Sequence, residues 1–413
     1  MTRIDRRQFV GSALAATALT GMPALAQGEP IRIAYIDPLS GPFANVGDNG
    51  LKQFQFEAAR INASGGINGR KMEVVGFDNK TNPKEAIVQL EKAIDQGFRF
   101  VSQGNGSSVA AAIIEAVEKH NERNPNQSML YLNYAAVDPA FTNDKCSFWH
   151  FRFDADADMK MAAMTDYLKG LTNIKKIYVI GQDYSFGKAV ADSAVAMLKV
   201  KRPDIEIVGN ELHPLGRVRD FVPYITKMRA AGAQAVITGN WGTDMTLLIK
   251  AASDTGFNVP FLTYYGGGLG APTAMGKSAV GLVKQITEWH ANIENIGMDQ
   301  VVTDFKKLHN LDYYYFRVKV MFDMLAAAMK KANSADPKAV ALALEGLEIE
   351  TPTGKAFMQK ENHQLIQPLY ISTFAENVKF DLENTGFGFK TDVKIEAQAT
   401  ITPTTCRMQR PAA

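Results

Sequence analysis

Apolar runs rich in Val, Ile, Phe and Tyr alternate along most of this 413-residue chain with stretches in which apolar residues recur every three or four positions. Such runs are typical of buried strands, and the second periodicity is typical of amphipathic helices. The alternation predicts βαβ units and parallel sheets. Strands are expected in two series, at 31–36, 72–77, 98–102 and 129–133, and at 176–181, 205–211, 233–239 and 259–264. We therefore expect an α/β protein with two doubly wound, Rossmann-like lobes.

The first 26 residues are typical of an export signal. Arg3, Arg6 and Arg7 precede an apolar stretch at 9–25, and the small residues at 24–26 predict cleavage after Ala26. Thr, Gly and Pro interrupt the stretch, which disfavours a membrane anchor. Residues 6–9 resemble a twin-arginine signal, and the Sec and Tat routes both stay open. No cysteine follows the cleavage pattern, so we expect a free periplasmic protein.

The charge balance excludes one class of partner. The chain has 45 basic and 43 acidic residues, and removal of Arg3, Arg6, Arg7 and Asp5 with the signal leaves 42 of each. A neutral mature chain has no electrostatic footprint for nucleic acid.

The two cysteines, Cys146 and Cys406, lie far apart in the sequence of a chain that we expect in an oxidising compartment. Either a disulfide joins the C-terminal tail to the end of the first lobe, or both residues are separate buried thiols. Two cysteines are too few for the common structural metal sites, and we predict no metal and no cofactor.

Ligands of open parallel sheets bind at the carboxyl ends of the strands, so the loops after the strands are the candidate site. Asn105, Gly106 and Ser107 lie between a strand and a helix, where unpaired N–H groups and the helix dipole favour an anion. Ser107 can add a hydroxyl donor, and Gly106 allows close approach to the backbone. A simple serine-capped turn is the alternative. The lysine of a P-loop is absent.

Further candidates follow the other strands. Ala135, Ala136 and Val137 come after the strand at 129–133 and leave room for a ligand, although tight strand–helix packing would use the same residues. Asp183, Phe186, Trp241 and Tyr265 follow strands of the second series, where a cleft wall is expected, and Tyr314 opens a later helix. Packing in the core is the alternative for these rings.

No enzyme constellation is found in the sequence. It has no Gly-x-Ser-x-Gly, His-Glu-x-x-His or Cys-x-x-Cys motif, and its six histidines lack metal spacing. We therefore expect a binding protein.

Several motifs give the chain a family resemblance. They are the Leu-Ser-Gly-Pro at 39–42 with Gly47 and Gly50, the segment at 61–69, the Phe-Asp-Asn at 77–79 and the Phe-Gly at 186–187. On these motifs the chain resembles the periplasmic leucine/isoleucine/valine-binding proteins, which are type I periplasmic binding proteins of ABC importers. The resemblance implies two lobes joined by three crossing segments, with residues 29–152 and 290–365 in the first lobe and 153–289 and 366–413 in the second. It also implies hinged closure on a solute, ABC permease subunits as partners and a monomeric protein.

The resemblance assigns the ligand carboxylate to Ser107. The Ala-Ala-Thr segment that contacts the ligand in the family corresponds to residues 135–137, where Val137 lacks the threonine hydroxyl. The aromatic residues that the family places in the second lobe and on a later helix correspond to Phe186, Trp241 and Tyr314. The acidic residue that pairs with a ligand amino group falls on Tyr265. Because a buried ammonium without a charged partner is unfavourable, we predict an aromatic or other apolar carboxylate as the ligand.

Two alternatives stay open for the function. If Asp183 or Asp244 replaces the missing acid, the ligand is a branched-chain or other hydrophobic amino acid. A stand-alone periplasmic sensor, which would report the ligand to a separate receptor, is the alternative outside transport.

Overall fold

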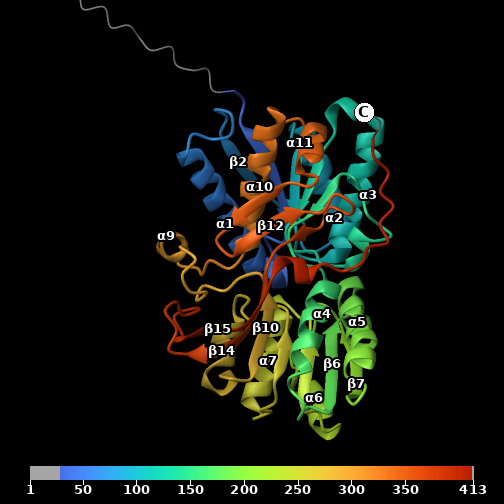
Figure 1. The fold of residues 1–413 in the computed structure, drawn as a ribbon, viewed down its shortest axis with the longest axis vertical. Coiled ribbons are helices and arrows are strands. Elements are labelled where there is room, and N and C mark those ends of the chain that lie inside the picture. The colour runs from blue at the N-terminus through green and yellow to red at the C-terminus, as the bar shows by residue number, and fades with distance from the viewer. Residues whose placement is uncertain (1–27, 412–413) are drawn as a thin grey trace, which may run out of the picture.

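The computed structural model describes residues 28–411 as two α/β lobes stacked along the long axis (Figure 1). The predicted signal and its cleavage site after Ala26 lie outside the described residues. Both sheets are flanked by helices, as the alternating sequence pattern predicts.

The first lobe, upper in Figure 1, contains a parallel sheet in the order β2-β1-β3-β4-β5. Its strands are β1 (Ile31–Asp37), β2 (Met72–Asp78), β3 (Phe100–Gln103), β4 (Leu130–Asn133) and β5 (His150–Arg152). The helices of this lobe are α1 (Ala44–Ala63), α2 (Pro83–Asp95), α3 (Ser107–Arg123), α10 (Phe316–Ala332) and α11 (Pro337–Leu344). In β1, Ile33 and Tyr35 pack with α1 and α10, whereas Ala34 and Ile36 pack with α2 and α3. Burial on both faces explains why the strand is a continuous apolar run.

The second lobe has a mixed sheet in the order β15-β14-β10-β9-β8-β6-β7. Its parallel strands are β6 (Lys176–Gln182), β7 (Glu206–His213), β8 (Ala235–Thr238), β9 (Phe261–Thr263) and β10 (Val283–Thr287). Two antiparallel strands, β14 (Leu369–Glu376) and β15 (Phe387–Ile395), extend one edge. The helices of this lobe are α4 (Ala157–Leu168), α5 (Ser185–Lys201), α6 (Val222–Ala230), α7 (Gly242–Asp254) and α8 (Ala271–Met275).

The connecting segments follow the crossings that the family resemblance implies. The chain leaves the first lobe between β5 and α4, returns between β10 and α10 through α9 (Asp299–His309), and leaves again after β13. Before that last crossing, β11 (Glu348–Thr351), β12 (Gly354–Met358) and β13 (Leu365–Ile366) form a small antiparallel sheet.

The C-terminal tail corrects the predicted division of the chain. Residues 366–413 were expected in the second lobe, but only the β14–β15 hairpin joins the sheet there. The following segment returns to the first lobe, where the end of the chain is marked in Figure 1. Cys406 forms a disulfide with Cys146, and the Thr404 hydroxyl donates to the Thr142 carbonyl at 2.7 Å. The bridge and these polar contacts hold the tail on the first lobe.

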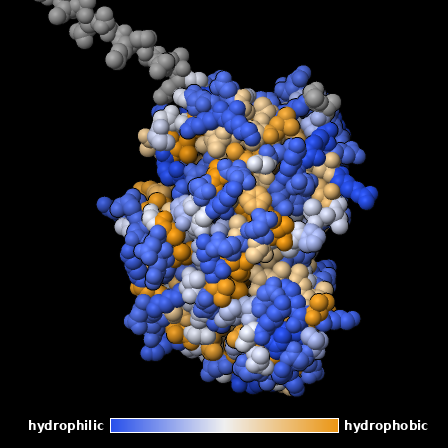
Figure 2. Space-filling model, viewed as in Figure 1, coloured by the Kyte–Doolittle hydropathy of each residue, from blue (hydrophilic) through white to orange (hydrophobic). Residues whose placement is uncertain are grey.

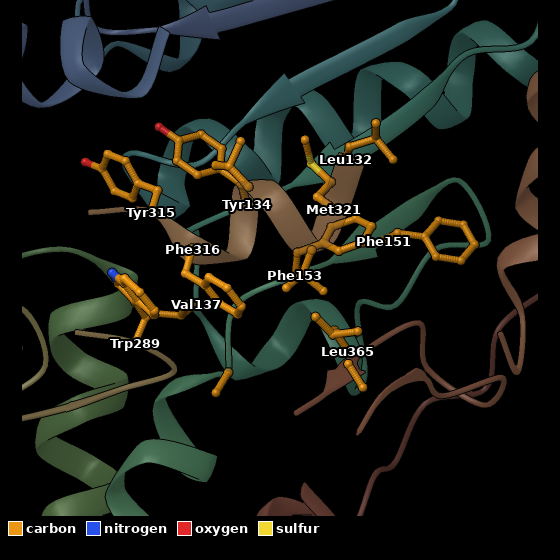
Figure 3. Packing of buried hydrophobic residues seen from close by; sticks show 14 of the residues in the cluster. Leu132, Tyr134, Val137, Phe151, Phe153, Trp289, Tyr315, Phe316, Met321 and Leu365 are labelled. Carbon is orange, nitrogen blue, oxygen red and sulfur yellow. The ribbon is translucent and has the colours of Figure 1, made fainter. Parts of the chain in front are cut away.

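A buried hydrophobic cluster runs from the first lobe into the second, beneath α4 and α5. Figure 3 shows Tyr134 and Tyr315 at one edge of it, with ring centroids 5.5 Å apart, and Trp289 stacked on Phe316. Hydrophilic residues dominate the face drawn in Figure 2. Within residues 28–411, no helix has the length and apolar character needed to cross a membrane.

Candidate ligand-binding site

A cavity lies between the lobes, at the carboxyl ends of strands of both sheets. Such a position is expected for ligands of open α/β sheets. Its wall is formed by the loops after β3, β4, β6, β8 and β9, the start of α1 and the segment that opens α10. The lining residues are Val46, Gly104, Asn105, Gly106, Ser107, Ala135, Val137, Tyr184, Phe186, Trp241, Gly242, Tyr265, Gly268, Leu269, Tyr314, Tyr315 and Arg317.

The start of α3 gives the first-lobe wall its hydrogen-bond donors. Gly106 is the N-cap of α3, so Ser107 is the first helical residue and not the cap. The φ angle of Gly106 is 98°, a conformation that favours glycine. The N–H groups of Ser107 and Ser108 bond to no carbonyl in the described part of the chain. Ser107 is 2% exposed, and its hydroxyl has no hydrogen-bond partner among residues 28–411. These donors are available to an anion in the cavity.

A buried carboxylate supports the loop that presents them. Asp37, at the end of β1, accepts hydrogen bonds from the N–H groups of Asn105 at 3.0 Å and Gly104 at 3.3 Å, and from the Tyr134 hydroxyl at 2.6 Å. Burial raises the pKa of Asp37 to about 7, although these hydrogen bonds oppose the rise. A Cβ on Gly104 would lie 2.7 Å from the Tyr134 ring, so the loop needs glycine there. Asp37 thus accepts hydrogen bonds from the N–H groups of the loop before α3, whereas the first N–H groups of α3 itself stay available to a ligand.

Aromatic rings from the second lobe form the opposite wall. The Trp241 indole N–H donates to the Tyr184 hydroxyl at 2.7 Å, which fixes both rings. Phe186 lies between Tyr184 and Tyr265, with centroid separations of 5.9 and 6.2 Å. This wall can cover a flat or branched apolar body.

Contacts across the cleft close one side of the cavity. The Trp241 ring lies 4.3 Å from the Phe43 ring of the first lobe, and the Thr243 hydroxyl donates to the Pro42 carbonyl at 2.5 Å. The two lobes therefore touch directly beside the cavity.

Sequence reasoning missed the charged group in the wall, Arg317. It is 2% exposed and pairs with Glu288 at 2.7 Å and with Asp154 at 3.5 Å. Asp154 also pairs with Lys160 at 2.8 Å. The sequence does contain a signal, because Arg317 shares the apolar face of α10 with Met321 at helical spacing, and a charge on such a face needs a partner.

The structure brings most of the predicted site residues together. The cavity is lined by Asn105, Gly106, Ser107, Ala135, Val137, Phe186, Trp241, Tyr265 and Tyr314.

Two predicted residues lie elsewhere. The Ala136 side chain packs into the hydrophobic cluster beneath α2 and α3. Asp183 is half exposed and pairs with Lys188 at 3.5 Å. Asp244, the other candidate acid, accepts hydrogen bonds from the Gln182 amide and the Gly216 N–H, each at 2.8 Å, and does not line the cavity.

Comparison with known proteins extends over both lobes. A sequence model of the family described as periplasmic binding protein matches residues 30–379. Leu/Ile/Val-binding protein homolog 4 of Brucella abortus (strain 2308) is 32% identical, and the match covers 97% of this chain and 98% of that protein.

Solved structures share the same architecture. The leucine-, isoleucine-, valine-, threonine- and alanine-binding protein of Brucella ovis, in its closed conformation, has a TM-score of 0.83 and 30% identity, over 92% of this chain and 100% of that one. A solute binding protein of an ABC transporter from Rhodopseudomonas palustris BisB5, in complex with 3,4-dihydroxy benzoic acid, shares the fold with a TM-score of 0.76 at 18% identity, over 89% of this chain and 98% of that one.

Proposed function

Because the chain belongs to the periplasmic binding protein family, we propose that it is the substrate-binding component of an ABC importer and binds a small carboxylate with an aromatic or apolar body. One observation carries the choice of ligand. The same cavity joins the free donors of Ser107 and the α3 terminus to the aromatic wall of Phe186, Trp241 and Tyr265. Closure of both lobes on one molecule would then present a distinct state to permease subunits.

The charges of the cavity wall favour a ligand without an amino group. Among the lining residues within 28–411, Arg317 is charged and positive, and no lining side chain is acidic. Tyr265, to which the family resemblance assigns the position of the acid, lines the cavity, and Asp183 and Asp244 lie outside the wall. An ammonium in this cavity would lack a carboxylate in contact, which is unfavourable.

A hydrophobic amino acid is the second candidate, and the names of the relatives favour it. Homolog 4 of Brucella abortus is named for Leu, Ile and Val, and the Brucella ovis protein is named for leucine, isoleucine, valine, threonine and alanine. In contrast, the Rhodopseudomonas palustris protein was solved with an aromatic acid. The two candidates differ in the ammonium group, so a direct comparison separates them.

The proposal is tested by isothermal titration of the purified protein with benzoate, leucine and phenylalanine. The protein is first unfolded and refolded to remove any ligand carried through purification. We expect benzoate to bind and both amino acids to bind at least ten-fold more weakly, which corresponds to about 1.4 kcal/mol. Leucine binding tighter than benzoate would contradict the aromatic-acid assignment in favour of the amino acid. Native mass spectrometry of protein that has not been refolded provides an independent identification.

A further inference from the structure

The cavity has a second polar end that the carboxylate site does not use. The Tyr314 hydroxyl is buried and has no hydrogen-bond partner in the part of the chain that is described. Its oxygen lies beside another wall residue, since a Cβ built on Gly268 would be 3.7 Å from it. Arg317 lines the same cavity, and its guanidinium is held by Asp154 at 3.5 Å and by Glu288 at 2.7 Å. Buried polar atoms are usually paired, so the Tyr314 hydroxyl indicates a position for a polar ligand group.

This end is separated from the α3 terminus by aromatic rings. The Asn105 amide donates to the Tyr134 hydroxyl at 2.8 Å, and the Tyr134 and Tyr315 ring centroids are 5.5 Å apart. The Arg317 guanidinium lies 5.1 Å from the Tyr315 centroid. A ligand whose carboxylate lies at Ser107 would then meet Tyr314 and Arg317 with its other end.

Charge balance decides which polar group fits there. The Arg317 and Lys160 cations are matched by the Asp154 and Glu288 carboxylates, all of them buried. A second ligand carboxylate would add a buried anion without a free cation partner, whereas a hydroxyl adds no charge. Burial raises the pKa of Tyr314, although Arg317 opposes the rise, so its hydroxyl stays protonated and can both donate and accept.

We propose that Tyr314 and Arg317 make this site specific for carboxylates that carry a neutral hydroxyl-type substituent at the end remote from the carboxylate. The proposal rests on the proposed function, because it places the carboxylate at Ser107. Tyr314 acts as the specificity-determining residue, and its phenol hydrogen-bonds to the substituent. Arg317, which is held by Glu288 and Asp154, adds positive charge to this end of the cavity.

The test compares three probes on three proteins by isothermal titration. The probes are benzoate, 4-hydroxybenzoate and terephthalate. At the position remote from the carboxylate, benzoate has no substituent, 4-hydroxybenzoate has a hydroxyl and terephthalate has a second carboxylate. The proteins are the unaltered protein, Tyr314→Phe, and Tyr313→Phe as the matched control, whose hydroxyl donates to Glu57 at 2.6 Å and does not line the cavity. Thermal denaturation monitors the folding of both variants. Tyr314→Phe removes an unpaired hydroxyl, so we expect it to fold.

The unaltered protein and Tyr313→Phe should bind 4-hydroxybenzoate about 2- to 10-fold more tightly than benzoate, and terephthalate more weakly than 4-hydroxybenzoate. Tyr314→Phe should bind benzoate and 4-hydroxybenzoate with similar affinity, so that the preference for the hydroxyl is lost. The inference is overturned if the unaltered protein prefers benzoate or terephthalate, or if Tyr314→Phe keeps the preference. Binding of benzoate without preference refutes the inference alone, whereas failure of every probe to bind refutes the proposed function as well.

Discussion

Replacing Ser107 with alanine should weaken carboxylate binding about 10- to 150-fold. The Ser107 hydroxyl is buried in the cavity wall without a protein partner, so its full contribution is available to the ligand. A hydrogen bond to a charged group contributes about 1.5–3 kcal/mol, and each 1.4 kcal/mol changes the dissociation constant about ten-fold. The backbone amides of α3 remain, so binding should be weakened and not abolished.

The chain offers a matched control one residue away. Ser108 is the next residue of α3 but is exposed to solvent and does not line the cavity, so Ser108→Ala makes the same change of helix propensity, within about 0.5 kcal/mol, without touching a ligand. Isothermal titration with benzoate should show a loss for Ser107→Ala and none for Ser108→Ala, with similar melting temperatures. An unchanged affinity in Ser107→Ala, or an equal loss in both variants, would refute the placement of the carboxylate at this hydroxyl.

Arg317→Met should lower the free energy of unfolding by about 3–5 kcal/mol in urea titrations, because it leaves the buried Glu288 carboxylate without its cation and Asp154 with Lys160 alone. Lys319→Met, whose ion pair is less buried, should lower it by less than about 1 kcal/mol, and equal effects would contradict this reasoning. The pKa of Asp37 is raised from 3.8 to about 7 by burial, so this group stabilises the fold at low pH and loses that contribution as the pH rises to about 7. Asp37→Asn should therefore gain in melting temperature relative to the unaltered protein as the pH rises from about 4 to about 7, and a difference that stays constant over this range would exclude a raised pKa. Replacing both Cys146 and Cys406 with serine should lower the free energy of unfolding by about 2–5 kcal/mol and expose the tail after residue 396 to proteases. An unchanged melting temperature and unchanged protease resistance would show that the bridge contributes little.

Sequence patterns predicted the parallel strands because these strands are buried on both faces. The strand expected at 31–36 is β1 (Ile31–Asp37), and the one expected at 233–239 is β8 (Ala235–Thr238). The hairpin of β14 and β15 escaped prediction, since β15 is a largely exposed edge strand that exists through its pairing with β14. Local periodicity does not report such pairing.

The same distinction holds within the candidate site. Ser107 could be placed from its position after a strand and before a helix, a relation between neighbours in the chain. The partners of Asp37 and Arg317 could not be predicted in this way, because they are distant in the sequence. Asn105 is 68 residues from Asp37, and Glu288 is 29 residues from Arg317. Ala136 was misplaced because strand-end position does not determine the direction in which each side chain points. Contacts that depend on the tertiary fold were therefore the ones that sequence reasoning missed.

The distribution of polar groups over the cleft explains how a ligand could control closure. Phe43 and Trp241 pack against each other across one side of the cleft, and this contact between the lobes involves no ligand. Closure also removes the hydroxyls of Ser107 and Tyr314 from bulk water, which is unfavourable unless they gain new hydrogen bonds. A ligand with a polar group at each end satisfies both hydroxyls, whereas an apolar molecule satisfies neither. Because a ligand shifts a conformational equilibrium only through its different affinity for the two states, the cleft would close most completely on a molecule that is polar at both ends and apolar between them.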